Sequence, residues 1–131
     1  MIGSPKHDLQ KVKQLVEERK VCFSSPSRSL NEVTRVYETT ATPKSQEDAE
    51  NFIYEGILKL GPGNFAGRVL QWEEVADVYG MIFDSRPWYV KFMVFRDEHN
   101  LDSLEEISFH PPKAPLPTLD GQTIPAEEVK S

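Results

Sequence analysis

The chain has 131 residues, a length typical of one domain that can bury a hydrophobic core. Its single cysteine, Cys22, excludes an internal disulfide framework and a cysteine-based zinc cluster. The formal net charge of −6 excludes a protein that holds nucleic acid by its overall field, but not an enzyme with a few local phosphate contacts. No leader-type segment opens the chain, and no apolar run approaches the roughly 20 residues of a membrane span. We therefore expect a soluble, cytoplasmic protein of bacterial origin.

Three helices are predicted in the first half of the chain, each from a polar capping residue followed by apolar residues at helical spacing. Their capping residues are Asp8, Ser29 and Ser45. Glu32 completes a capping box with the second of these, and Gly61 stops the third helix. After the first helix, residues 21–23 form a short β-prone run in which we expect Cys22 to be a buried apolar residue.

From Asn64 onward, the helical spacing of apolar residues gives way to the alternation of β-strands. The predicted strands are 65–72, 75–83, 88–95 and 104–110. In the third of these strands, Trp88, Val90, Phe92 and Val94 should face the helices, and the residues between them should face away. The order of elements predicts an α+β fold with three N-terminal helices packed on a C-terminal antiparallel sheet of about four strands.

The C-terminal segment is rich in proline. Five of the ten prolines follow His110, so residues 1–112 are predicted to form the domain and residues 113–131 a proline-rich tail. Proline cannot continue a central strand, so the tail is expected to be an extended polyproline arm on the surface or disordered. Because it lacks apolar periodicity, we expect it to bury little.

One face of the predicted sheet gathers side chains capable of acid–base chemistry. By alternation, Tyr89 and Lys91 share a face of their strand, and Glu106, Ser108 and His110 share a face of the next. Arg68 can join them from the first strand. A base for the 2′-hydroxyl, cations for the phosphate and an acid for the leaving oxygen are the groups of a ribonuclease that needs no metal or other cofactor. The alternative is an ordinary solvated sheet face.

Several short motifs resemble those of the MqsR (motility quorum-sensing regulator) toxin family. They are Asp77-Val78-Tyr79, then Tyr89-Val90-Lys91 at the family's spacing, Ile107-Ser108-Phe109 on the last strand, and Asn64-Phe65 after a helix that ends in Leu-x-Leu. The first helix is also similar, and the resemblance covers roughly residues 6–112. It implies a RelE-like fold and a bacterial type II toxin that cleaves mRNA without a metal and is neutralised by a cognate antitoxin.

The resemblance also assigns site residues. The family's catalytic tyrosine falls on Tyr89, and the lysine of its Ser-Phe-Lys motif falls on His110. A further catalytic lysine falls on Gly67, next to Arg68, and a glutamine falls on Ala76.

These assignments lead to two functional hypotheses. In the first, the chain is a metal-independent endoribonuclease for single-stranded mRNA. Its catalytic residues are Tyr89, His110 and Arg68, and its substrate-binding residues are Lys91, Ser108 and Tyr79. The alternative is a catalytically inactive RelE-like binding module that engages a protein partner.

Overall fold

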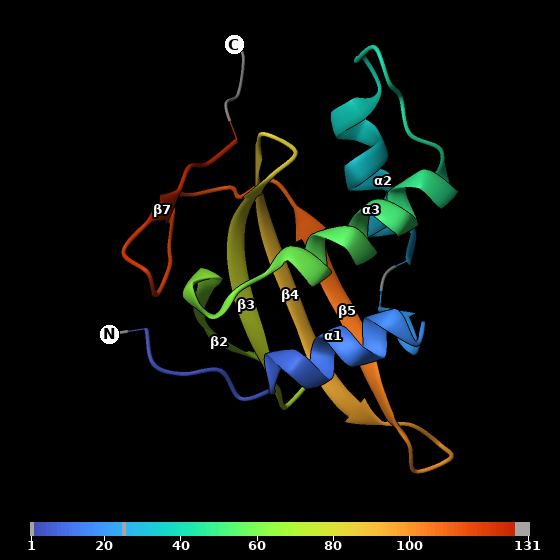
Figure 1. Ribbon diagram of the computed structural model, residues 1–131, viewed down its shortest axis with the longest axis vertical. Coiled ribbons are helices and arrows are strands. Elements are labelled where there is room, and N and C mark those ends of the chain that lie inside the picture. Colours follow the sequence, from blue (N-terminus) through green and yellow to red (C-terminus); the bar gives the residue numbers. More distant parts are fainter. Residues whose placement is uncertain (1, 25, 128–131) are drawn as a thin grey trace.

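The computed structural model describes residues 2–24 and 26–127 and shows an α+β fold (Figure 1). Its helices are α1 (Leu9–Glu17), α2 (Pro26–Tyr37) and α3 (Gln46–Lys59), with a 3-10 turn at Pro62–Asn64. Its strands are β1 (Val21–Phe23), β2 (Phe65–Gln71), β3 (Glu74–Phe83), β4 (Arg86–Arg96), β5 (Asp102–His110), β6 (Leu116–Pro117) and β7 (Thr123–Ile124). Among the described residues, the main sheet has five strands in the order β1-β5-β4-β3-β2.

The sheet has one strand more than predicted, and it is mixed. Residues 21–23 form β1, which lies between the first two helices in the chain and pairs in parallel with β5. The other neighbouring strands are antiparallel, as predicted. Cys22 in β1 is exposed, so the prediction of a buried thiol is wrong: β1 is an edge strand, and its central side chain faces solvent.

The helices begin where polar side chains can satisfy their free backbone N–H groups. Asp8 accepts a 2.9 Å hydrogen bond from the backbone of Gln10 at the start of α1. Ser45 and Asp48 form a reciprocal capping box at the start of α3. Helix α2 begins at Pro26, earlier than predicted, and the Ser29 hydroxyl donates to Glu106 instead of capping the helix.

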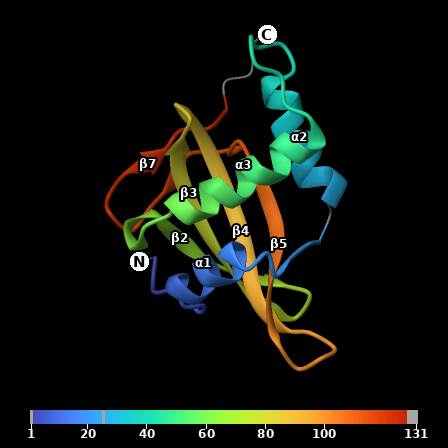
Figure 2. The same cartoon turned by 45° about the vertical axis from the view of Figure 1, so that its right-hand side comes forward.

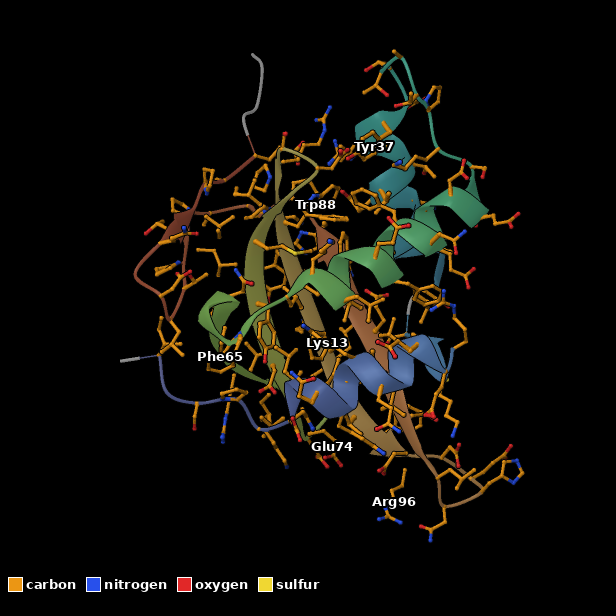
Figure 3. The ribbon with its side chains drawn as sticks, in the orientation of Figure 1. Lys13, Tyr37, Phe65, Glu74, Trp88 and Arg96 are labelled. Atoms are coloured by element: carbon orange, nitrogen blue, oxygen red, sulfur yellow. The ribbon has the colours of Figure 1, made fainter. Side chains whose placement is uncertain are left out.

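The core lies between the helices and one face of the sheet, which we call the inner face (Figure 2). On β4, Trp88, Val90 and Phe92 are fully buried there, and Val94 packs at the margin, as predicted. Phe65 on β2 belongs to the same core, and Figure 3 labels both Phe65 and Trp88 on the sheet. Consequently, the intervening residues of β4 point to the opposite, outer face.

Two β-bulges change which side chains reach the outer face. In β5, Ser108 pairs with Lys91 but Glu106 pairs with Phe92, so Ile107 is an extra residue. The bulge turns Glu106 onto the inner face, and the prediction that it shares a face with Ser108 is wrong. A second bulge, at Ala66 in β2, reverses the sheet face on which each following residue of β2 lies.

The C-terminal arm, residues 111–127, folds back over the outer face. Its strands β6 and β7 form a small hairpin, and Ile124 within it is only 1% exposed. The arm comes so close to Gly80 that a Cβ there would lie 2.7 Å from a methyl group of Leu116. The prediction that this segment buries little is therefore wrong for Thr118 and Ile124, which are buried, whereas most other residues of 113–127 are exposed. Residues 128–131 lie outside the described residues.

Candidate functional site

Tyr89 and His110 form a stacked pair on the outer face. They are direct partners across β4 and β5, and their rings lie 4.9 Å apart with only 12° between their planes. Both side chains are half-buried. Burial raises the pKa of the Tyr89 phenol, which therefore keeps its proton at neutral pH. The structure thus brings together the two residues that the sequence assigned to acid–base catalysis.

A backbone hydrogen bond fixes the tautomer of His110. Its Nδ1 lies 2.7 Å from the carbonyl oxygen of Pro111, and because a carbonyl only accepts, Nδ1 carries the proton of this bond. Burial lowers the pKa of His110, and the positive charges of Lys113 and Arg28 lower it further. The hydrogen bond to Pro111 and the negative charge of Glu32 raise it, but the net shift is downward. The neutral ring therefore has a free lone pair on Nε2, the arrangement of a general base.

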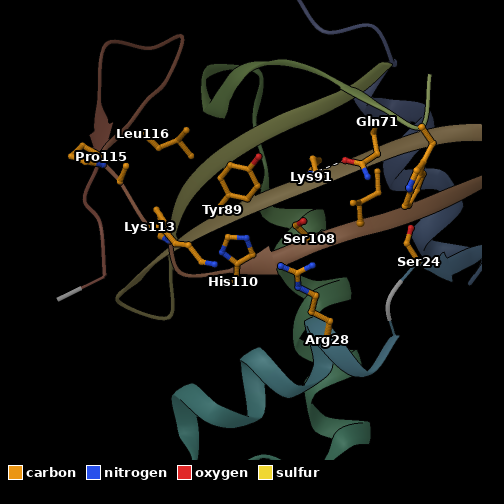
Figure 4. Close-up of a pocket in the computed structure, with 14 residues that line it drawn as sticks. Ser24, Arg28, Gln71, Tyr89, Lys91, Ser108, His110, Lys113, Pro115 and Leu116 are labelled. Atoms are coloured by element: carbon orange, nitrogen blue, oxygen red, sulfur yellow. Dashed lines mark hydrogen bonds between the residues drawn. The ribbon is translucent and has the colours of Figure 1, made fainter. Parts of the chain in front are cut away.

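A pocket with a volume of about 440 Å³ surrounds this pair (Figure 4). Its lining comes from β1–α2, β2–β3, β4, β5 and the arm: Ser24, Arg28, Gln71, Trp72, Tyr89, Lys91, Ile107, Ser108, His110, Pro112, Lys113, Ala114, Pro115 and Leu116. Three of these described lining residues are basic and none is acidic. In a chain of net charge −6, this is a local concentration of positive charge.

The basic residues reach the pocket from three separate elements. Lys91 on β4 donates a 3.0 Å hydrogen bond from Nζ to Oε1 of Gln71. Burial lowers the pKa of Lys91, and the nearby charge of Arg28 adds to this effect. Arg28 extends from α2 toward Ser108 and His110, and Lys113 approaches His110 from the arm (Figure 4). An anion entering the pocket would relieve the mutual repulsion of these groups.

Of the predicted binding residues, Lys91 and Ser108 lie in the pocket, opposite one another across β4 and β5. Tyr79 does not. Its ring is fully buried on the inner face, 5.5 Å from the ring of Phe65 and 5.3 Å from that of Phe92. The assignment of Tyr79 to substrate binding is therefore wrong, because its strand partner is the core residue Val90.

Arg68 is also absent from the pocket. The bulge at Ala66 pairs Arg68 with Asp77, on the helix-covered side of the sheet, and its Nε donates to the carbonyl oxygen of Ser4 at 2.7 Å. Without the extra residue, alternation would have turned Arg68 to the outer face. The structure therefore does not support the catalytic assignment of Arg68. Arg28, which the sequence analysis did not single out, supplies an arginine to the pocket instead.

Glu106, on the inner face beneath α2, takes no part in the pocket. It is 0% exposed, one carboxylate oxygen accepts a 3.0 Å hydrogen bond from Ser29, and the other has no partner among the described residues. Burial raises its pKa to about 8 despite the Ser29 bond, and the charge of Glu105 adds to the rise. Glu106 is therefore a protonated acid at neutral pH.

The described residues contain no group of three or more His, Cys, Asp and Glu side chains placed to hold a metal ion. Over the same part of the chain, no helix has the length and apolar character that a membrane crossing needs. The chain matches no protein-family model, and a search of curated proteins found no match.

Proposed function

We propose that the chain is a metal-independent endoribonuclease that cleaves single-stranded RNA in the pocket on its outer face. The observation that carries this proposal is the stacked Tyr89–His110 pair inside a basic, acid-free pocket of an acidic protein. Together with the MqsR-like motifs, it favours a RelE-like mRNA-cleaving toxin of a bacterial type II toxin–antitoxin system. Such a toxin would act in the cytoplasm and have a cognate antitoxin as its protein partner.

The proposed reaction starts at the free nitrogen of His110. Nε2 takes the proton of a ribose 2′-hydroxyl, and that oxygen attacks the neighbouring phosphorus. The bond from phosphorus to the 5′-oxygen breaks, Tyr89 donates its proton to the leaving oxygen, and the products are a 2′,3′-cyclic phosphate and a 5′-hydroxyl end. The His110 proton then returns to the Tyr89 phenolate through solvent. Both groups begin in the required protonation state, because burial keeps the imidazole neutral and the phenol protonated.

The basic residues would stabilise the charge of the pentacovalent phosphorus. Lys91 lies two residues from Tyr89 on the same strand, about 7 Å along β4, and Arg28 approaches from the β5 side. Fixed cations directed at developing charge are among the largest contributions to catalysis. In this proposal Arg28 and Lys91 hold the phosphate, and Arg68 has no part.

The test is cleavage of a single-stranded RNA in EDTA. His110→Gln and Tyr89→Phe should each lower the rate by roughly 10²–10⁴-fold, the usual contribution of a positioned proton-transfer group. An RNA with a 2′-O-methyl group at the cleavage site should be resistant, because it lacks the attacking hydroxyl. The rate should rise with pH through the lowered pKa of His110, since the base must be unprotonated.

The two arginines provide a matched comparison. Arg28→Ala should weaken RNA binding and reduce the dependence of binding on salt, whereas Arg68→Ala should leave both close to wild type. Cleavage that survives His110→Gln and Tyr89→Phe unchanged would refute the mechanism. Equal effects of the two arginine changes would refute the location of the phosphate.

One observation favours the alternative hypothesis, a catalytically inactive module that binds a protein partner. The positions that carry a lysine and a glutamine in the MqsR family are Gly67 and Ala76 here, and Ala76 is fully buried. Neither residue has a group that can take part in proton transfer. A wild-type protein that neither cleaves nor binds RNA, and does not slow bacterial growth when expressed, would make this alternative the better account.

A further inference from the structure

The two tryptophans of the chain have opposite environments. Trp88 is 0% exposed in the core, whereas Trp72 is 60% exposed and lines the pocket. Trp72 follows Gln71, whose side-chain oxygen accepts the hydrogen bond from Lys91. Trp72 therefore lines the same pocket as this cation, and little of its surface is used for folding.

The turn that presents Trp72 is unfavourable for a bulky residue. Gln71 pairs with Glu74, so Trp72 and Glu73 form a two-residue hairpin loop, with φ of 51° and 67°. Loops of this kind favour Asn and Gly, because both central residues occupy the left-handed region. An aromatic residue here is explained neither by the turn nor by the core, and strained, exposed residues of this kind are found at ligand sites.

The charges and rings of the pocket follow an order. Trp72 and Gln71 stand at the end of β2, Lys91 comes next, and the Tyr89–His110 pair lies two residues farther along β4 and across to β5. Lys113 on the arm lies beyond His110 (Figure 4). An exposed aromatic ring beside a row of cations is how proteins bind single-stranded nucleic acid: the cations hold the backbone and the ring stacks with an unpaired base.

We propose that Trp72 stacks with a nucleobase of single-stranded RNA whose phosphate is held by Lys91 and Arg28. This subsite rests on the proposed ribonuclease function and adds a determinant of its substrate: the strand must be unpaired where it meets Trp72, because a base within a duplex is already stacked on both sides. The stacked base lies on the β2 side of the scissile bond. Stacking is tolerant of base identity, so the subsite selects single strands and not a particular sequence.

The test uses a short oligonucleotide with 2′-O-methyl groups throughout, which the proposed reaction cannot cut. Binding should quench the emission of the wild-type protein in a saturable way, because one of its two tryptophans is exposed and stacks with a base. Trp72→Phe should abolish the quenching but keep most of the affinity, since a ring remains. Trp72→Ala should weaken binding by roughly 5- to 150-fold, the range for loss of one base–aromatic stack.

Leu70→Ala is the matched control. Leu70, which lies two residues before Trp72 in β2, is 74% exposed but does not line the pocket, so its loss should leave binding unchanged. The same oligonucleotide annealed to its complement should bind clearly more weakly than the single strand. Wild-type affinity in Trp72→Ala, or equal affinity for single strand and duplex, would overturn the proposed subsite.

The outcomes separate the subsite from the catalytic proposal. Cleavage that depends on His110 but not on Trp72 would overturn only the subsite. A wild-type protein that binds no oligonucleotide would overturn both proposals, and Trp72 would then be better explained as a contact for a protein partner.

Discussion

Glu106 should make the stability of this protein fall as pH rises, and Glu106→Gln should remove the effect. The buried carboxyl has a pKa of about 8, against 4.5 for an ordinary glutamate. Between these values the folded state holds a proton that the unfolded state has released, so the free energy of unfolding decreases with pH. At about 1.4 kcal/mol per pKa unit, the wild-type protein should be less stable by about 5 kcal/mol above pH 8 than below pH 4.5. This is a large part of the total stability of a small domain.

The glutamine variant has nearly the same shape and can still accept the hydrogen bond from Ser29. At pH 5 it should match the wild type or be slightly less stable, because its amide group meets no acceptor in this site. At pH 8.5 it should be more stable by several kcal/mol. Urea denaturation at half-unit pH intervals from 5 to 9 measures the two slopes directly.

Glu105→Gln is the matched control, since Glu105 is the adjacent residue on the outer face and accepts a hydrogen bond from Ser24. It should change the pH dependence in this range far less than Glu106→Gln. If wild type and Glu106→Gln have parallel pH dependences, Glu106 is not a buried acid and the register of β5 is wrong.

Three further predictions test the sheet faces and the arm. Phe92→Ala should destabilise the protein by roughly 3–5 kcal/mol through lost burial and a residual cavity, and Tyr89→Phe by far less; equal denaturation midpoints would contradict the assigned faces. Truncation after Pro112 should lower the free energy of unfolding by about 1.5–3 kcal/mol through the loss of buried Ile124 alone. An unchanged denaturation midpoint would show that the arm contributes nothing to stability. Gly80→Val should displace the arm and speed its proteolysis, because a Cβ there has no room; unchanged protection would refute the close approach.

Alternation along single strands was enough to predict much of the site. The regular pattern of β4 correctly placed Trp88 inward and Tyr89 outward, and the pairing with β5 places His110 beside Tyr89. The helices could be predicted equally well from the sequence, because their caps and apolar spacing are local features. The edge strand β1 was visible only as a β-prone run, since its parallel pairing with β5 depends on how α1 and α2 pack.

The predictions that failed concern features that no local sequence pattern encodes. A single extra residue at Ala66 decided the face of Arg68, and alternation gives no sign of where a bulge will occur. Arg28 and Lys113 were missed because α2 and the arm reach the pocket only through tertiary packing. The arm itself was judged by its prolines, but its burial depends on Ile124 and on the bare backbone of Gly80.

The bulge in β5 also determines which of two adjacent glutamates faces the core. If Ile107 paired regularly with Phe92, Glu106 would lie opposite Met93 on the outer face, which is the position that Glu105 holds in the structure. With the bulge, Glu106 is buried beneath α2, where its pKa is raised, and Glu105 faces outward and accepts a hydrogen bond from Ser24. The residues that line the pocket include no acid, and the one opposite Lys91 is Ser108.

Placing an acid opposite Lys91 tests whether the lack of acidic lining residues favours phosphate binding. In Ser108→Glu a carboxylate about 8 Å from a bound phosphate would repel it by about 2 kcal/mol at an effective dielectric constant of about 20, or roughly 30-fold in affinity. Ser108→Gln has the same size without the charge and should bind within a few-fold of wild type. The measurement is the affinity for the 2′-O-methyl oligonucleotide at several salt concentrations, and the defect of Ser108→Glu should shrink as salt rises. If both variants weaken binding equally, the effect is steric, and the absence of acids from the pocket has no bearing on phosphate binding.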